Sequence, residues 1–461
     1  EEVGAASTEN IRTNTNATFL QNINVGVAIT AGKLGIGFTD ANIKVGSGAL
    51  DSLTTGINNT AVGKDALTAN TGGNSNEAFG MQALTSNTTG NYNSAFGYSA
   101  LEKNTSGAGN AAVGFKALEE NTTADYNTAM GYECLTNNTT GATNTGVGYH
   151  ALLLNTTGAN NTAVGALALD ANTTADNNTS IGYASLSANT TGTQNNAFGV
   201  NCLDANTTGD YNVAMGTNAL GANTTANHNS AFGTNALLLN TTGNNNTAIG
   251  AFALDANTTS ANNTALGYNS MSDNTTGAAN VAIGAYALDA NTTESYITAV
   301  GSYALTANTT GTKNAALGSG SLQTNTTGDF NTALGSYALS GNTTASNNTS
   351  VGYQSLYTNT TGASNTAVGY EALYANTTGA ENTALGVDAL KSNTTGSGNL
   401  AVGGHALQAN TTASHNTAVG KEALYNNTTG SYNVAVGRYA LDANTTASSN
   451  TAVGYHALGA C

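Results

Sequence analysis

The sequence predicts an all-β protein, a parallel β-solenoid of about 24 coils, and three observations predict it. A 17-residue unit, typified by Asn161–Asn177 (N-T-A-V-G-A-L-A-L-D-A-N-T-T-A-D-N), recurs without interruption. Its glycine falls at every seventeenth residue from Gly63 to Gly454, which makes 24 copies. The unit is also too short, and too rich in Gly and Asn, to form two packed helices. A fixed period of this kind is typical of a solenoid.

Composition limits the core and the partners. The 461 residues include 56 Gly and no Pro, and 8% are charged, against about 25% in ordinary globular domains. The net charge is −16 with only ten Lys plus Arg, which disfavours nucleic acid and anionic membrane surfaces as partners. No run of 18 apolar residues occurs, so we expect no membrane insertion. The composition favours a thin core and a soluble fibre.

The sequence divides into two parts. Residues 1–45 do not fit the repeat, and we predict that they form an N-terminal cap or attachment block. Three of its segments are predicted to be short strands, because apolar and polar residues alternate in them or Gly-bearing turns flank them. They are Phe19–Thr30, Lys33–Phe38 and Asn42–Val45. Residues 46–461 form the predicted solenoid, which starts with a degenerate copy that has Leu53 where later copies have Asn.

Each copy is predicted to contain two short strands. T-A-V-G is assigned to the first and x-A-L-x to the second, and N-T-T-G-x-x is assigned to a turn. The glycine column, represented by Gly165, never varies, which indicates a special backbone conformation or a close backbone approach. The residue before it is always apolar, as is the residue four positions after it. We therefore expect Val164 and Leu169 to stack into the core in every coil.

The column before Leu169 admits only small residues, and two of them are Cys134 and Cys202. A slot of this size indicates packing against backbone, so both thiols are expected to be buried. The three cysteines, with Cys461, show neither metal-ligand spacing nor a disulfide pattern.

Two asparagine columns, represented by Asn161 and Asn172, allow two interpretations. Stacked side-chain amides would form hydrogen-bonded ladders between coils. Alternatively, the N-T-T asparagine is a glycosylation acceptor, for example at Asn172, Asn257 and Asn444. We favour the ladder, because the Asn161 column recurs equally well although it is often not an acceptor motif.

Variable columns mark the outside of the coil. Tyr is frequent directly after the glycine and at the last position of the copy, as at Tyr132 and Tyr126. Such rows suit stacking on sugar rings or contact with a neighbouring subunit, or they are scattered surface aromatics.

The residues offer no catalytic constellation. The five histidines lie many copies apart in different columns, and the recurring aspartates, such as Asp170 and Asp255, skip most copies. No Gly-rich loop is followed by the Lys and helix that bind phosphate. We predict neither an enzyme, nor a cofactor, nor a metal site.

The repeat at Asn161–Gly165 and Ala168–Leu169 is similar to the repeats of trimeric autotransporter adhesin heads. It looks closer still to N-T-A-V-G-Y-x-A-L arrays of phage tail-fibre-like and bacterial surface proteins, in which Lys33–Gly37 has counterparts. The resemblance implies a left-handed β-roll, commonly trimeric, displayed outside the cell or virion for adhesion or reach. The chain departs from it in its longer unit, and in lacking a coiled-coil stalk, a membrane anchor and a chaperone domain.

The predicted function is therefore an extracellular structural or adhesive fibre, with cell-surface glycans as candidate ligands. It would assemble with itself, either as a trimer or as a head-to-tail filament in which the N-terminal block meets the unfinished copy of the next subunit. The residues expected at these assembly ends are Phe19, Ile23, Val25, Val27, Leu458 and Cys461. An ice-binding solenoid, based on the paired threonines, is a minor alternative.

Overall fold

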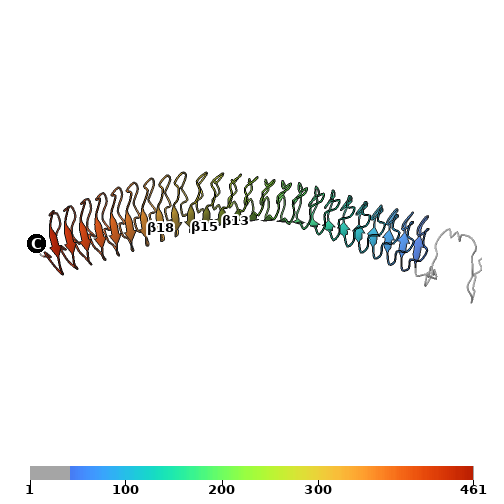
Figure 1. Cartoon of the computed structure of the whole chain (residues 1–461), viewed down its shortest axis with the longest axis horizontal. Helices are drawn as coiled ribbons and strands as arrows, with labels where there is room; N and C mark the ends of the chain where they lie inside the picture. The colour runs from blue at the N-terminus through green and yellow to red at the C-terminus, as the bar shows by residue number, and fades with distance from the viewer. Residues whose placement is uncertain (1–41, 460–461) are drawn as a thin grey trace, which may run out of the picture.

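The computed structural model describes residues 42–459 as one long, gently curved rod (Figure 1). It confirms the parallel β-solenoid with a 17-residue repeat, and the described residues contain no helix. A single parallel sheet of 25 strands runs along the rod. Each strand pairs with the next strand in the chain at an offset of 17 residues, as in Thr162↔Thr179. At ~4.8 Å per coil the sheet is roughly 115 Å long.

Every strand has three residues. The strands are β1 Ile43–Val45, β2 Thr60–Val62, β3 Glu77–Phe79, β4 Ser94–Phe96, β5 Ala111–Val113, β6 Thr128–Met130, β7 Thr145–Val147, β8 Thr162–Val164, β9 Thr179–Ile181, β10 Asn196–Phe198, β11 Val213–Met215, β12 Ser230–Phe232, β13 Thr247–Ile249, β14 Thr264–Leu266, β15 Val281–Ile283, β16 Thr298–Val300, β17 Ala315–Leu317, β18 Thr332–Leu334, β19 Thr349–Val351, β20 Thr366–Val368, β21 Thr383–Leu385, β22 Leu400–Val402, β23 Thr417–Val419, β24 Val434–Val436 and β25 Thr451–Val453.

The prediction of two strands per coil is wrong. The second segment, x-A-L-x, does hydrogen-bond to both neighbouring coils, since Leu167 N donates to Tyr149 O (2.9 Å) and Leu169 N to Ser185 O (3.0 Å). However, Leu167 and Leu169 have φ of 59° and 55°. Two left-handed residues in this segment prevent an extended strand. Each coil of the solenoid therefore contains one strand, and its second side is a hydrogen-bonded segment that is not a β-strand.

The core is made of small residues and one leucine per coil. Ala163, Ala168 and Leu169 are fully buried, and the same three columns are buried along the rod. The expectation for Leu169 is thus confirmed, and Met271 occupies the same buried column in its coil. Burial of a leucine side chain contributes about 1.5–3 kcal/mol, so this column is a main source of stability in every coil.

The expectation for Val164 is wrong. In a strand, successive side chains point to opposite faces, and Ala163 takes the inward direction, so Val164 points outward and is only half-buried. Larger residues of the same column, such as Phe79, Met130 and Leu266, are 37–49% exposed. The core has room for a methyl group at the middle of each strand, and the larger apolar side chains form a stripe on the surface.

The glycine column explains the sharp corner after each strand. Gly165 has a φ of 140°, and a Cβ built on it would lie 2.3 Å from the carbonyl oxygen of Gly182. Both the backbone conformation and the close approach between coils exclude a side chain. The expectation for this column is confirmed.

Both asparagine columns form ladders inside the coil. Asn172 Nδ2 donates to Asn155 Oδ1 (2.7 Å) and to Ala175 O (3.1 Å). Asn161 Nδ2 donates to Ala175 O (2.8 Å), and its backbone N donates to Asn144 Oδ1 (2.9 Å). Buried polar groups must be paired, and here the repeat itself supplies the partner one coil away.

The boundary predicted at residue 45 lies too late by a few residues. Asn42 is already buried and receives a hydrogen bond from the backbone N of Asn59 (2.8 Å), and Ile43–Val45 pairs with β2. The first coil therefore starts at Asn42. The predicted strands at Phe19–Thr30 and Lys33–Phe38 lie outside the described residues.

Candidate interaction surfaces

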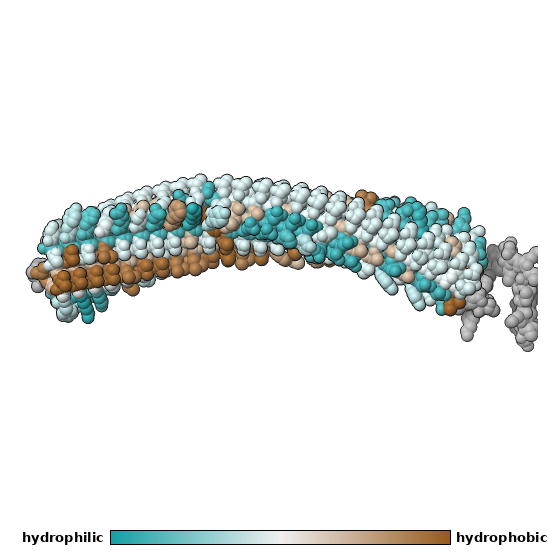
Figure 2. Space-filling model, viewed as in Figure 1, coloured by the Kyte–Doolittle hydropathy of each residue, from teal (hydrophilic) through white to brown (hydrophobic). Residues whose placement is uncertain are grey.

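The outward side of the sheet forms a surface that we call the strand face. It consists of the first and third residues of β1 to β25. The third residue is Val, Ile, Leu, Phe or Met in all 25 strands, and we call this line of side chains the apolar row. Figure 2 shows the row as a continuous brown stripe along the C-terminal part of the rod. Thr is the commonest first residue.

The strand face is nearly free of charge. Among the first and third residues of the 25 strands only Glu77 is ionisable, although the chain carries 36 residues of Lys, Arg, Asp and Glu, as the sum of 10 and 26. Within residues 42–459, the other charged residues therefore lie outside the strand face. The face also has a shallow recess of about 280 Å³ over β16–β18, lined by Thr298, Ala315, Ala316, Leu317, Thr332, Ala333 and Leu334.

A second surface is a short stack of aromatic rings next to the glycine corner. Tyr98, Phe115, Tyr132 and Tyr149 stack coil on coil, with ring centroids 5.1–5.7 Å apart and interplanar angles of 11–18°. The in-register repeat brings these rings together, since each follows the glycine of its coil. Because each ring covers the face of the next, the inner rings of this stack offer edges rather than faces to a sugar.

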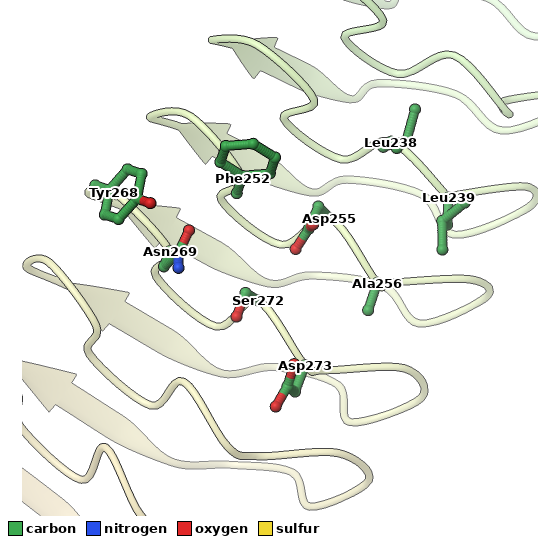
Figure 3. Close-up of a pocket in the computed structure, with 9 residues that line it drawn as sticks. All are labelled: Leu238, Leu239, Phe252, Asp255, Ala256, Tyr268, Asn269, Ser272 and Asp273. Carbon is green, nitrogen blue, oxygen red and sulfur yellow. The ribbon is translucent and has the colours of Figure 1, made fainter.

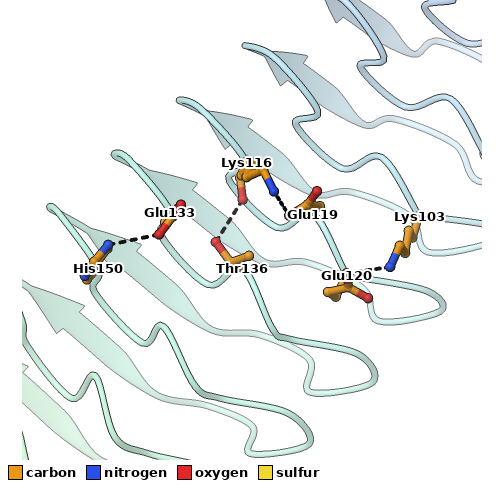
Figure 4. Close-up of polar contacts among 7 residues, drawn as sticks. All are labelled: Lys103, Lys116, Glu119, Glu120, Glu133, Thr136 and His150. Carbon is orange, nitrogen blue, oxygen red and sulfur yellow. Dashed lines mark hydrogen bonds and ion pairs between the residues drawn. The ribbon is translucent and has the colours of Figure 1, made fainter.

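Ion pairs gather beside this stack (Figure 4). Lys116 lies 3.2 Å from Glu119, and Lys103 lies 2.5 Å from Glu120. His150 Nε2 lies 3.0 Å from Glu133, and Thr136 donates to the carbonyl of Lys116 (3.0 Å). The hydrogen bond that Lys103 donates to Glu120 raises the pKa of Lys103. The Lys116–Glu119 pair lies within one coil, whereas the other two pairs join neighbouring coils. All three involve partly exposed side chains, and pairs of this kind contribute little to stability.

A hollow lies on the turn side of the coils around β13 (Figure 3). It has a volume of about 300 Å³ and is lined by Leu238, Leu239, Phe252, Asp255, Ala256, Tyr268, Asn269, Ser272 and Asp273. Burial raises the pKa of Asp255, and the nearby carboxylates of Asp273 and Asp289 add to the effect. The hollow is open to solvent, and the hydroxyl of Ser272 in its lining donates to the carboxylate of Asp289 (2.5 Å). Neither His nor Lys is among the lining residues.

The remaining titratable groups are also dispersed. Within residues 42–459 no three His, Cys, Asp or Glu side chains are placed to hold a metal ion. Cys134 and Cys202 are fully buried free thiols, as expected, and burial raises the pKa of each to about 12. Burial also raises the pKa of Asp170, Asp204 and Asp289.

The glycosylation hypothesis conflicts with the ladder. Asn172 and Asn257 are fully buried, and Asn444 is 6% exposed. The side-chain nitrogen of each makes two donor contacts, to the preceding asparagine and to a backbone carbonyl. A glycan on these nitrogens would have no room in the folded coil.

Of the residues expected at the assembly ends, only Leu458 lies in the described part, where it is 44% exposed. Phe19, Ile23, Val25, Val27 and Cys461 lie outside it. No helix in the described residues is long and apolar enough to cross a membrane. No protein-family model matches the chain, and no curated protein matches it.

Proposed function

We propose that the chain is an extracellular, non-enzymatic structural fibre that provides reach or adhesion and works as an assembly of its own copies. The observation that carries the proposal is the unbroken stack of 25 in-register coils. A stack of this kind grows in one dimension only, because each coil contacts only its neighbours. The result is a stiff rod with a length of roughly 115 Å at ~4.8 Å per coil.

The arrangement of polar groups supports a structural role. Enzyme sites gather several different groups at one point, whereas the repeat distributes like groups along lines. The buried amides of Asn155 and Asn172, which are hydrogen-bonded at 2.7 Å from one coil to the next, are an example. The stack of hydrogen bonds between coils also suits a fibre that must resist proteases outside the cell, as local opening of the backbone precedes cleavage.

A head-to-tail filament is the second proposal, and it rests on the uniform register. β24 and β25 pair in the same register as the earlier strands, as in Val436↔Val453. The edge of β25 therefore presents the same backbone arrangement as the edge of any strand inside the stack. Another copy with a compatible first coil would extend the sheet through ordinary strand pairing.

Adhesion to glycans is the proposed use of the more isolated aromatic residues. Tyr92, Tyr126 and Tyr296 are 69–72% exposed at the last position of their copies, whereas the inner rings of the Tyr98–Tyr149 stack are covered. The ice-binding alternative loses support, because Thr173 Oγ1 donates to the carbonyl of Thr190 (3.2 Å) in the coiled N-T-T segment. Its hydroxyl is not part of a flat, free array.

Electron microscopy of the purified full chain tests the proposal. We expect stiff rods, with a length of roughly 115 Å from ~4.8 Å per coil for single or side-by-side copies. Filaments much longer than this would favour head-to-tail growth, and discrete rods would exclude it. Flexible or globular particles would contradict the fibre. Antibody labelling of intact producing cells or particles tests the location, and labelling only after permeabilisation would contradict an extracellular role.

A further inference from the structure

We propose that the strand face is covered by the strand face of a second copy of this chain, so that the fibre consists of solenoids packed side by side. The inference rests on the proposed fibre function and assigns the surface that joins the copies. It starts from the apolar row, which places one large apolar side chain at the end of all 25 strands.

The size of the face argues for a stable interface. Three residues at ~3.3 Å each give a width of about 10 Å, and the 24 spacings between 25 strands, at ~4.8 Å each, give a length of roughly 115 Å. The face therefore measures on the order of 1,100 Å² per copy, above the ~800 Å² that each partner contributes to a standard interface. The apolar row runs along the whole of this length, and monomeric soluble proteins rarely expose a continuous apolar patch larger than a few hundred Å².

The absence of charge points in the same direction. Interface cores are depleted of charged residues, and Glu77 is the only ionisable residue at the outward strand positions of β1–β25. Side chains of the row stay partly exposed in the single chain, for instance Met215 at 47%, Ile249 at 40% and Leu385 at 47%. The other charged residues of the described coils sit outside the strand face, where they keep an assembled fibre soluble.

The period of the face selects a second copy as the partner. A globular protein covers only part of a surface this long, whereas another solenoid presents the same coil spacing and the same length. Two sheets that pack face to face interlock their outward side chains at about 10 Å separation. The recess over β16–β18, in which the small Ala315 lies between Thr298 and Thr332, gives room for a large side chain from the facing copy.

The mass of the purified chain in solution tests the inference, with light scattering during size exclusion as the measurement. One variant carries Ile249→Lys, Leu266→Lys and Ile283→Lys on the strand face of three consecutive coils. The matched control carries Thr259→Lys, Thr276→Lys and Thr293→Lys, which lie exposed on the N-T-T segments of the same three coils. Both variants change the charge equally.

The wild type and the control are expected at twice the chain mass of 45.8 kDa, and the strand-face variant at the mass of one chain with an unchanged circular dichroism spectrum. A wild type that stays monomeric, or a strand-face variant that keeps the oligomeric mass, overturns the inference.

If the triple variant fails to fold, single cysteines replace it. In a Cys461→Ser background, Ile249→Cys is expected to form disulfide-linked dimers on mild oxidation and Thr259→Cys is not. Equal cross-linking at both positions, or none at Ile249→Cys, overturns the inference. Monomeric rods of the expected length would contradict the packing of copies and leave the extended-fibre proposal standing.

Discussion

At the scale of single residues, the repeat is governed by size more than by hydrophobicity. The glycine column excludes even a methyl group, because its φ is positive and the next coil lies 2.2–2.6 Å from an added Cβ along most of the rod. The middle strand position accepts Ala, Ser or Gly from β2 to β25, whereas the position after it accepts anything from Val to Phe. The constrained column is buried and the permissive one is not.

Replacing Gly165 by Ala is expected to disrupt the stack locally. The new Cβ would meet the Gly182 carbonyl at 2.3 Å, at a φ of 140° that L residues rarely adopt. We expect a loss of several kcal/mol, on the scale of severe backbone strain, visible as fast hydrogen exchange in the coils that contain β8 and β9. Gly158→Ala is the matched control: an added Cβ there would lie 2.4 Å from the carbonyl oxygen of Ala175, but Gly158 has no positive φ, and Ala124 and Ala175 occupy that column naturally. Equal loss of protection in both variants would contradict the role assigned to the corner.

The buried thiols predict a pH effect. Burial raises the pKa of Cys134 and Cys202 to about 12, from 9.0. Above pH 9 the unfolded chain releases these protons while the folded chain retains them, so stability falls as pH rises from about 9 to about 12. A Cys134→Ala, Cys202→Ala variant should show a weaker decline in thermal midpoint over this window. An identical decline in both proteins would show that other groups cause it.

Reactivity provides a second check at the same residues. In a Cys461→Ser background, a thiol reagent at pH 8 should label the native chain slowly and the denatured chain at two sites, because the thiolate is the reactive form and both sulfurs are buried. Rapid labelling of the native protein would mean that the coils around Cys134 or Cys202 open readily.

At the scale of the coil, much of the fold could be predicted from the sequence. The period predicted the solenoid, the invariant glycine predicted the corner, and the two asparagine columns predicted the ladders. The number of strands per coil could not be predicted from the x-A-L-x segment. Residues in it such as Asp65 and Leu67 are left-handed (φ 58° and 51°), and their side chains do not favour this conformation. It is imposed by hydrogen bonds to both neighbouring coils.

The prediction of which strand side chains face the core was also wrong, although the sequence contained the information needed. Hydrophobicity placed Val164 inside, whereas alternation along T-A-V allows Ala163 or its two neighbours to face the core, but not all three. Because the Ala163 column accepts only small residues, Ala163 is the side chain that faces the core, and its two neighbours face outward. The same reasoning correctly predicted burial at Cys134 and Cys202, and it would have identified the strand face as a candidate surface.

The asparagine ladder predicts a large effect from a small substitution. Asn172→Asp removes two donor hydrogens and places carboxylate oxygens against Asn155 Oδ1 and Ala175 O, at 2.7 and 3.1 Å. We expect a cost of about 2–5 kcal/mol, from unpaired buried acceptors and a buried charge, measured as lost hydrogen-exchange protection in the adjacent coils.

Asn227→Asp is the control for that substitution. Asn227 Oδ1 accepts from the backbone N of Asp210 (2.6 Å), and Asp210 does the same for Thr193 (2.7 Å) in the same column. A carboxylate fits there, so little change is expected. Similar costs at both sites would contradict a specific role for the buried ladder.

At the scale of the whole molecule, the in-register stack predicts that length is adjustable in whole coils. Removing five copies, residues 162–246, joins Asn161 to Thr247 and keeps every column in phase. The rod should remain folded and shorten by roughly 24 Å at ~4.8 Å per coil, measured as the maximum dimension in small-angle X-ray scattering. Stability per coil should hardly change, because each coil interacts with its neighbours alone.

A deletion of residues 162–238, eight residues shorter than five copies, provides the control. It joins Asn161 to Leu239, so that the copy after the junction is out of phase with the copy before it. The Asn161 and Asn172 ladders and the Leu169 column are then interrupted at one point, and we expect protease cleavage at the junction together with two shorter protected fragments. Equal resistance of both deletions would mean that the ladders do not set the register. A folded in-phase deletion that keeps the original length would contradict the solenoid as the source of the rod's reach.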